Sequence, residues 1–250
     1  MKKTTSAWIS AVVLTVIVYT SYTGFLKAHR QTRAIIQAGF INACDTGSVD
    51  DMRKLLAAGA DVNSEDRGFL PLQAAANFCS AEKVDLLLQK GADANGRAFP
   101  NGDTALMISV ESCLDTNVPK RLIAAGADVN AKGGKVFGSG QEHTPLMVLA
   151  QGVGKEKIAI ARLLVDAGAQ VDLTNDDGDT ALILTAKKMS QGLGLIEMFD
   201  FLVSRGANVN ARNHAGETPM KVVKSGEILK SDPQGYTALI RHMQKAGAHD

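Results

Sequence analysis

Aromatic residues are scarce in this chain of 250 residues. Phenylalanine, tyrosine and tryptophan together account for 5% of it, and there is one tryptophan. The apolar fraction is nevertheless 45%, so we expect a core of alanine, leucine and valine, as in a stack of small helices. Cysteine is also rare, with three residues, and neither sign of charge dominates, because 27 Lys and Arg face 26 Asp and Glu.

These shortages exclude several classes of function. A chain without excess basic charge is a poor ligand for phosphates, so no nucleic-acid partner is predicted. The cysteines form no CxxC pair and the five histidines have no metal-ligand spacing. The acidic run at 175–179 has its glycine at the wrong offset for a calcium loop. We therefore predict no metal and no cofactor.

Catalytic motifs are missing as well. The chain contains no GxSxG, and the glycine-rich segment at 152–156 lacks the first glycine and the Ser or Thr of a phosphate-binding loop. No serine, histidine and aspartate are spaced so that they would meet. The sequence thus predicts no catalytic residues and a protein that is not an enzyme.

The N-terminus has a composition of its own. Lys2 and Lys3 precede an uncharged stretch, Ala7–Leu26, which as a helix would be about 30 Å long, the thickness of a hydrocarbon core. We interpret residues 1–28 as a signal anchor or, alternatively, a cleaved signal peptide. The first reading predicts a single-pass inner-membrane protein with a periplasmic repeat domain and membrane contact only through residues 7–26. The second predicts a soluble periplasmic protein, and a buried core helix is a third reading.

A pentapeptide recurs through the rest of the chain. GADVN, GADAN, GADVN, GAQVD and GANVN begin at Gly59, Gly91, Gly126, Gly168 and Gly206, and a final GAH begins at Gly247. Each copy closes an apolar stretch, where its glycine can end a helix. Self-similarity at this period indicates a solenoid, and such arrays bind partners along a surface.

A second motif marks the start of each helical pair. TALM, TPLM, TALI and TPMK begin at Thr104, Thr144, Thr180 and Thr218, and LPLQ begins at Leu70. Threonine is a good helix cap, and proline is tolerated in the first turn. We therefore expect the first helix of each pair to begin at this motif.

The two motifs together resemble the ankyrin repeat, whose consensus joins TPLH, an Ala-Ala pair, an LLL segment and GADVN in about 33 residues. The resemblance implies an all-α solenoid of about six helix-turn-helix units with hairpin-like fingers over residues 31–250, preceded by an N-terminal hydrophobic helix. The expected repeats are 31–63, 64–95, 96–130, 131–172, 173–210 and 211–250. The consensus histidine is replaced, for example by Gln73, so its hydrogen bonds are expected to be missing.

The spacing of the motifs departs from the family pattern. From the capping position to the closing glycine, the distance grows from 21 residues (70 to 91) to 29 residues (218 to 247). The extra residues fall between the two helices, so they either thicken one edge of the array or lengthen the helices.

The fingers, which connect successive repeats, carry the candidate binding residues. One finger has a long insertion at 131–143, and three fingers place a basic residue two positions before a phenylalanine. Aromatic side chains beside cations are typical of protein-binding surfaces. The alternative is that each phenylalanine packs on the next finger. The predicted partner-binding residues are Arg67, Phe69, Arg97, Phe99, Lys135, Val136 and Phe137.

Cys79 and Cys113 occupy equivalent positions in neighbouring repeats. Packed helices lie about 8–10 Å apart, whereas a disulfide joins Cα atoms about 4.4–6.8 Å apart, so the sequence leaves open whether they are bridged. Cys44 falls on a core position and is expected to be a buried, free thiol.

These observations predict a non-catalytic protein-interaction module, tethered to or exported across the inner membrane. The lysine-led apolar start and the loosened consensus resemble exported or membrane-anchored bacterial ankyrin-repeat proteins. That resemblance suggests an immunity or inhibitor protein that binds and neutralises a secreted toxin or enzyme. The alternative is a structural scaffold or accessory subunit that assembles or protects envelope proteins.

Overall fold

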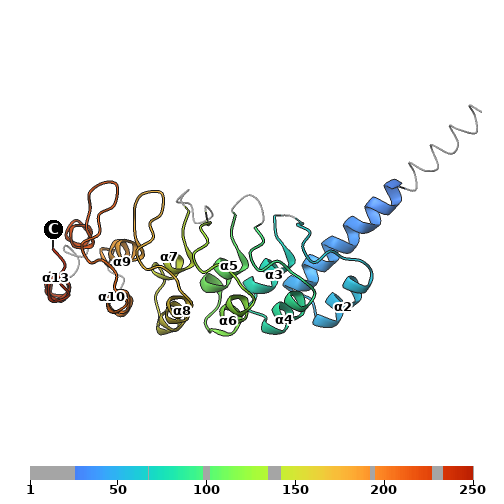
Figure 1. Ribbon diagram of the computed structural model, residues 1–250, viewed down its shortest axis with the longest axis horizontal. Helices are drawn as coiled ribbons and strands as arrows, with labels where there is room; N and C mark the ends of the chain where they lie inside the picture. Colours follow the sequence, from blue (N-terminus) through green and yellow to red (C-terminus); the bar gives the residue numbers. More distant parts are fainter. Residues whose placement is uncertain are drawn as a thin grey trace, which may run out of the picture.

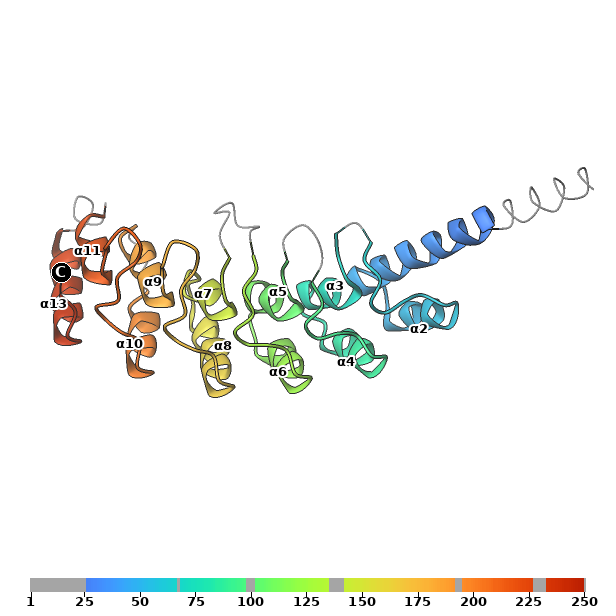
Figure 2. The same ribbon diagram turned by 45° about the horizontal axis from the view of Figure 1, so that its top comes forward.

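The computed structural model describes residues 26–66, 68–97, 102–134, 142–191, 195–226 and 233–249. In these ranges the regular structure is helical, with three isolated bridges and no strand. The helices stand in two rows along an elongated array, and the fingers project from one side of it (Figures 1 and 2). The predicted all-α solenoid is confirmed.

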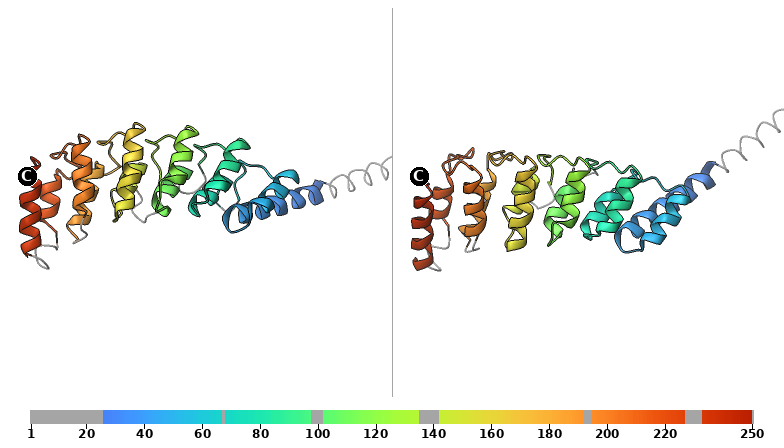
Figure 3. Two further views of the ribbon diagram at one scale, coloured as in Figure 1. Left: turned by 90° about the horizontal axis from the view of Figure 1, so that it is seen from below. Right: turned by 60° about the horizontal axis from the view of Figure 1, so that its bottom comes forward.

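Each repeat contributes one helix to each row (Figure 3). The first helices are α3 (Pro71–Asn77), α5 (Ala105–Ser112), α7 (Pro145–Leu149), α9 (Ala181–Met189) and α11 (Pro219–Lys224). The second helices are α2 (Val49–Ala57), α4 (Ala81–Gln89), α6 (Asn117–Ala124), α8 (Lys155–Asp166), α10 (Ile196–Ser204) and α13 (Pro233–Lys245). Residues 26–45 are also helical and extend outward from the end of the array (Figure 1).

The expected threonine caps are present. In α5, α7, α9 and α11 the threonine hydroxyl accepts the backbone N–H three residues later, at 3.2–3.3 Å. In α3, where the cap is Leu70, the Gln73 side chain accepts the Leu70 N–H at 3.0 Å instead. The Gln73 amide also donates to the Asp103 carbonyl of the next repeat at 2.6 Å. One of the inter-repeat bonds expected to be missing is therefore made by glutamine.

The pentapeptide glycines end the second helices as expected. All six lie in the left-handed region, with φ between +85° and +96°. In every copy, the N–H of the following alanine donates to the carbonyl five residues earlier at 2.9–3.0 Å. The side chain four residues before the glycine is fully buried in five copies: Leu87, Leu122, Leu164, Leu202 and Met243. In these five copies the glycine turn therefore follows a fully buried core residue by one helical turn.

The last residue of the pentapeptide joins neighbouring repeats. The Asn63 amide donates to the Gly91 carbonyl at 3.0 Å and accepts the Asp93 N–H at 2.8 Å. Asn95, Asn130 and Asn210 repeat this pair of bonds to the next unit. At the N-terminal end, the Gln37 amide accepts the Asp61 N–H in the same way, but it donates to the Asp61 and Ser64 carbonyls. A ladder of side-chain amides therefore runs along the array.

The extra residues between the motifs partly lengthen the second helices. The helix α8 has 12 residues and α13 has 13, whereas α4 has nine and α6 has eight. The extra residues of the last two repeats fall at 190–194 and 230–235, and both segments lie partly outside the described residues.

The predicted inner-membrane location is wrong. No helix in the part of the chain that the structure describes is long and apolar enough to cross a membrane. Of the stretch Ala7–Leu26, and of the hydrophobic helix predicted there, only Leu26 lies in the described part. The helix at 26–45 carries Lys27, Arg30 and Arg33 on exposed positions, and such charges are costly to place in hydrocarbon.

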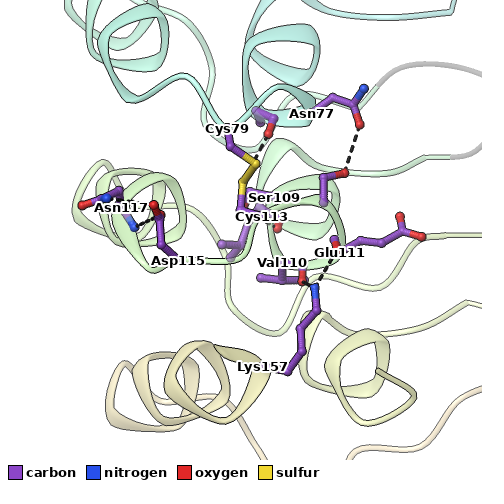
Figure 4. Close-up of a disulfide and its surroundings, with 12 residues drawn as sticks. Asn77, Cys79, Ser109, Val110, Glu111, Cys113, Asp115, Asn117 and Lys157 are labelled. Carbon is purple, nitrogen blue, oxygen red and sulfur yellow. Dashed lines mark hydrogen bonds between the residues drawn. A yellow bond between two sulfur atoms is a disulfide. The ribbon is translucent and has the colours of Figure 1, made fainter. Parts of the chain in front are cut away.

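The open question about the cysteines is resolved by a disulfide between Cys79 and Cys113, whose Cα atoms lie 5.5 Å apart (Figure 4). Each cysteine follows the first helix of its repeat, where the chain turns. At these turns the two Cα atoms lie closer together than the axes of two packed helices. Cys79 has a left-handed backbone, with φ +53°. Cys44 is free and buried, as expected, and burial raises the pKa of its thiol to about 12.

Candidate functional site

Two half-exposed phenylalanines stand out on the first-helix layer near the N-terminal end. Phe69 precedes α3 and is 48% exposed, and Phe78 follows α3 and is 51% exposed. The other phenylalanines in the described ranges, Phe40, Phe199 and Phe201, are buried. Exposed aromatic side chains are costly to leave in water, so their grouping indicates a contact surface.

The backbone fixes both aromatic residues. Phe69 exchanges two backbone hydrogen bonds of 3.0 Å with Asp66, which closes a tight turn of the first finger. Phe78 caps the C-terminal end of α3 and is followed directly by the bridged Cys79. The disulfide fastens this turn to the end of α5 (Figure 4). Both rings therefore extend from constrained positions.

A cleft of about 190 Å³ lies between the two phenylalanines. Its other lining residues are Ile41 and Asp45 of the helix at 26–45, with Ala74 and Asn77 of α3. Three elements, the N-terminal helix, the first finger and α3, thus form one mainly apolar cavity with a polar rim. Its size suits a single apolar side chain of a partner protein. We call it the Phe69–Phe78 cleft.

Of the predicted binding residues, the structure describes Phe69 and Arg97. Phe69 lines the cleft, whereas the Arg97 guanidinium donates to the Gly102 carbonyl at 2.7 Å and to the Lys132 carbonyl. Arg97 therefore links two fingers of the array. The remaining predicted residues lie outside the described ranges: Arg67, Phe99, Lys135, Val136 and Phe137. The predicted role of all seven in partner binding stays a prediction.

Two carboxyl groups lie one repeat beyond the cleft. Asp103 occupies in the third repeat the position that Phe69 occupies in the second, and Glu111 corresponds to Asn77. The Oδ1 atom of Asp103 is buried without a hydrogen-bond partner. Burial raises the pKa of the Asp103 carboxyl to about 6, against the opposing effect of Arg97. Burial, and then the negative charge of Asp103, raise the pKa of Glu111.

The nearest cations are already hydrogen-bonded elsewhere. The Lys157 ammonium donates to the Val110 and Glu111 carbonyls at 2.7 and 2.6 Å, at the C-terminal end of α5 (Figure 4). Burial lowers the pKa of Lys157, while the Glu111 carboxylate acts in the opposite direction. Arg97 donates to finger carbonyls, as described above. Among the described residues, neither cation forms an ion pair with Asp103 or Glu111.

Sequence reasoning missed Phe78, Asp103 and Glu111. Phe78 could have been noticed because it stands at a helix end, where the family pattern has a turn. The two acids could have been noticed by aligning the repeats on their capping residues.

In the described part of the chain, no group of His, Cys, Asp and Glu side chains could hold a metal ion. The surface is suited to binding a protein.

Comparison with protein families gives a match to ankyrin repeats (three copies) over residues 40–133 and 115–213. Among curated proteins, the mouse B-cell lymphoma 3 protein homolog is 30% identical over 151 residues, which is 58% of this chain and 32% of the relative. The chain spans between 4% and 37% of the length of the first curated relatives that it matches.

Two solved bacterial structures cover most of the chain. The solved complex of a predatory endopeptidase from Bdellovibrio bacteriovorus with an immunity protein contains a chain that is 26% identical, with a TM-score of 0.63. The match covers 83% of this chain and 97% of that one. An ankyrin repeat domain from Acinetobacter baumannii is 19% identical, with a TM-score of 0.66, and covers 84% and 98%. The second likeness concerns the fold alone.

Proposed function

Because the chain belongs to the ankyrin-repeat family, whose repeats mediate protein–protein interactions, we propose that it is a non-catalytic inhibitor that binds and neutralises another protein, as an immunity protein does. The observation that carries this proposal is the Phe69–Phe78 cleft. It presents two half-exposed aromatic rings, one beside the disulfide-linked turn after α3 and one on a tight turn of the first finger. Aromatic anchors around a pocket commonly dominate the energy of an interface.

The likeness to the endopeptidase–immunity complex supports this choice of binding role. That structure contains an immunity protein bound to an endopeptidase, and the likeness covers nearly the whole matched chain. We therefore expect the partner to be a hydrolase, with the repeat array covering its active site. The competing role is a scaffold that assembles or protects envelope proteins without changing any activity.

The test begins with photo-crosslinking from position 78 of the full chain in the cells that produce it, followed by mass spectrometry of the product. The partner is then purified and assayed alone and with the chain. We expect one stoichiometric partner whose hydrolase activity is lost at equimolar chain. Several partners of similar affinity, or a partner with unchanged activity, would favour the scaffold.

A matched pair of variants tests the site. Phe78→Ala should weaken partner binding roughly tenfold or more, the loss expected when a buried anchor is removed. Val153→Ala removes another exposed apolar side chain, which lies in the turn before α8 and does not line the cleft. It should leave affinity unchanged. Equal effects of the two variants would exclude the cleft as the centre of the interface.

A further inference from the structure

Two equivalent positions beside the helix cap carry different charges in the third and fifth repeats. The residue before each helix-capping threonine and the residue seven after it occupy the same two places in every repeat. In the fifth repeat these residues are Asp179 and Lys187, around Thr180. In the third repeat they are Asp103 and Glu111, around Thr104. A lysine of one repeat is therefore a glutamate in the other.

In the fifth repeat the buried carboxylate is fully partnered. Asp179 is 1% exposed. The Lys187 ammonium donates to its Oδ2 atom, and the Asn213 amide donates to its Oδ1 atom at 2.9 Å. Buried carboxylates need such partners, because an unpaired buried charge is strongly destabilising. This repeat supplies its own cation.

In the third repeat the same place has no lysine. Glu111 brings a second carboxyl group where the fifth repeat has an ammonium, and the Oδ1 atom of Asp103 has no hydrogen-bond donor. The donors of Arg97 and Lys157 are engaged with backbone carbonyls. Asp103 is half-buried and Glu111 is exposed, so a cation that takes the place of Lys187 in repeat three can reach both carboxyl groups from solvent.

The acid pair adjoins the Phe69–Phe78 cleft. Phe69 and Asp103 are equivalent positions of successive repeats, and α3 packs against α5. The Gln73 amide reaches the Asp103 carbonyl, and the Ser112 hydroxyl donates to the Asn77 side chain at the rim of the cleft, at 3.0 Å. The axes of packed helices in successive repeats lie about 10 Å apart. One short segment of a partner can therefore reach both places.

We propose that the partner inserts an apolar side chain between Phe69 and Phe78, and a lysine or arginine of the same segment against Asp103 and Glu111. The incoming cation takes the place that Lys187 holds in the fifth repeat. This inference rests on the proposed function and defines the chemistry of the partner at that site. An acidic segment is disfavoured, because it would meet two carboxyl groups.

The probe for this proposal is a library of random linear peptides displayed on phage and selected on the full chain. We expect the enriched peptides to combine an apolar residue with Lys or Arg a few positions away. Binding of the synthetic consensus peptide should weaken roughly tenfold or more with Phe78→Ala. Enrichment of acidic peptides, enrichment that Phe78→Ala leaves unchanged, or no enrichment at all would overturn the proposal.

A second variant tests the internal comparison. Glu111→Lys gives the third repeat the Asp–Lys pair of the fifth, so it should raise the melting temperature and abolish the preference for basic peptides. Glu82→Gln, which removes an exposed carboxylate on α4, is the control and should change neither quantity. If the Glu111→Lys protein has an unchanged melting temperature and still enriches basic peptides, the role given to the acid pair is contradicted.

The outcome also separates the two proposals. If basic-apolar peptides bind as expected but the natural partner keeps its activity, the inhibitor function fails and this inference stands. If the partner is inhibited but its affinity is the same for Glu111→Lys and the unaltered chain, the inference fails and the function stands.

Discussion

Asp172 accepts the backbone N–H of Asn208 through both carboxylate oxygens, at 3.1 and 3.2 Å. The other four repeats with this motif place an asparagine at the same position, and those amides also donate to the glycine carbonyl of the next repeat. An ionised aspartate has no donor. The amide ladder is therefore incomplete between the fourth and fifth repeats.

Asp172→Asn should complete the ladder by adding a bond to the Gly206 carbonyl. We expect the free energy of unfolding to rise by about 1 kcal/mol, the usual net contribution of one hydrogen bond. Urea denaturation followed by circular dichroism measures it. The reverse change, Asn130→Asp, should lower stability by a similar amount. If both changes were destabilising, the donated bond would not be the reason for asparagine here.

Lys187→Met should destabilise the fifth repeat, because it leaves the buried Asp179 carboxylate without its cation. The Asn213 bond remains and Lys187 is partly solvated, so we expect roughly 1.5–3 kcal/mol, the range for a bond to a charged group. The neighbouring change Lys188→Met is the control and should cost much less. Equal losses in thermal unfolding would show that the ion pair is not responsible.

The acid pair should make stability depend on pH. Burial raises the pKa of Asp103 from 3.8 to about 6 in the folded state, so the folded state binds this proton more tightly than the unfolded state. The resulting stabilisation is complete below pH 4 and is lost as the pH rises to about 6. Melting temperatures of the unaltered chain and of Asp103→Asn should therefore diverge across this interval, with the variant relatively more stable at pH 7. A constant difference from pH 3.5 to 7 would contradict the effect.

Removing the disulfide with the double change Cys79→Ser and Cys113→Ser should destabilise the array. The bond closes a loop across 34 positions, for which the loss of chain entropy predicts about 3–4 kcal/mol. Urea denaturation of the two proteins measures the difference. The affinity for the selected peptide should also fall, because Phe78 precedes Cys79. The buried Cys44 thiol should stay unlabelled by iodoacetamide in the native state of both proteins.

The sequence predicted the repeating parts of the fold well, because they depend on local chemistry. An N-cap threonine and a helix-ending glycine act on backbone groups only a few residues away. Their positions in the sequence therefore show where each helix begins and ends. The same reasoning misjudged Gln73, which replaces a histidine and still bonds the next repeat. It placed the binding residues in the fingers by pattern alone and passed over Phe78. The helix end at Phe78 could be expected from the repeat pattern, but its exposure depends on how α3 packs against the neighbouring elements.

By itself, the sequence determined that the chain is a solenoid of helical pairs, because five copies of one pentapeptide impose the same turn five times. Only the tertiary structure decided which departures from the pattern meet. Phe69, Phe78 and Ile41 form one cleft, Cys79 reaches Cys113, and Asp103 lies without the lysine that serves Asp179. These relationships join residues on different helices and repeats. They depend on how the repeats pack against each other, which spacing along the chain does not specify.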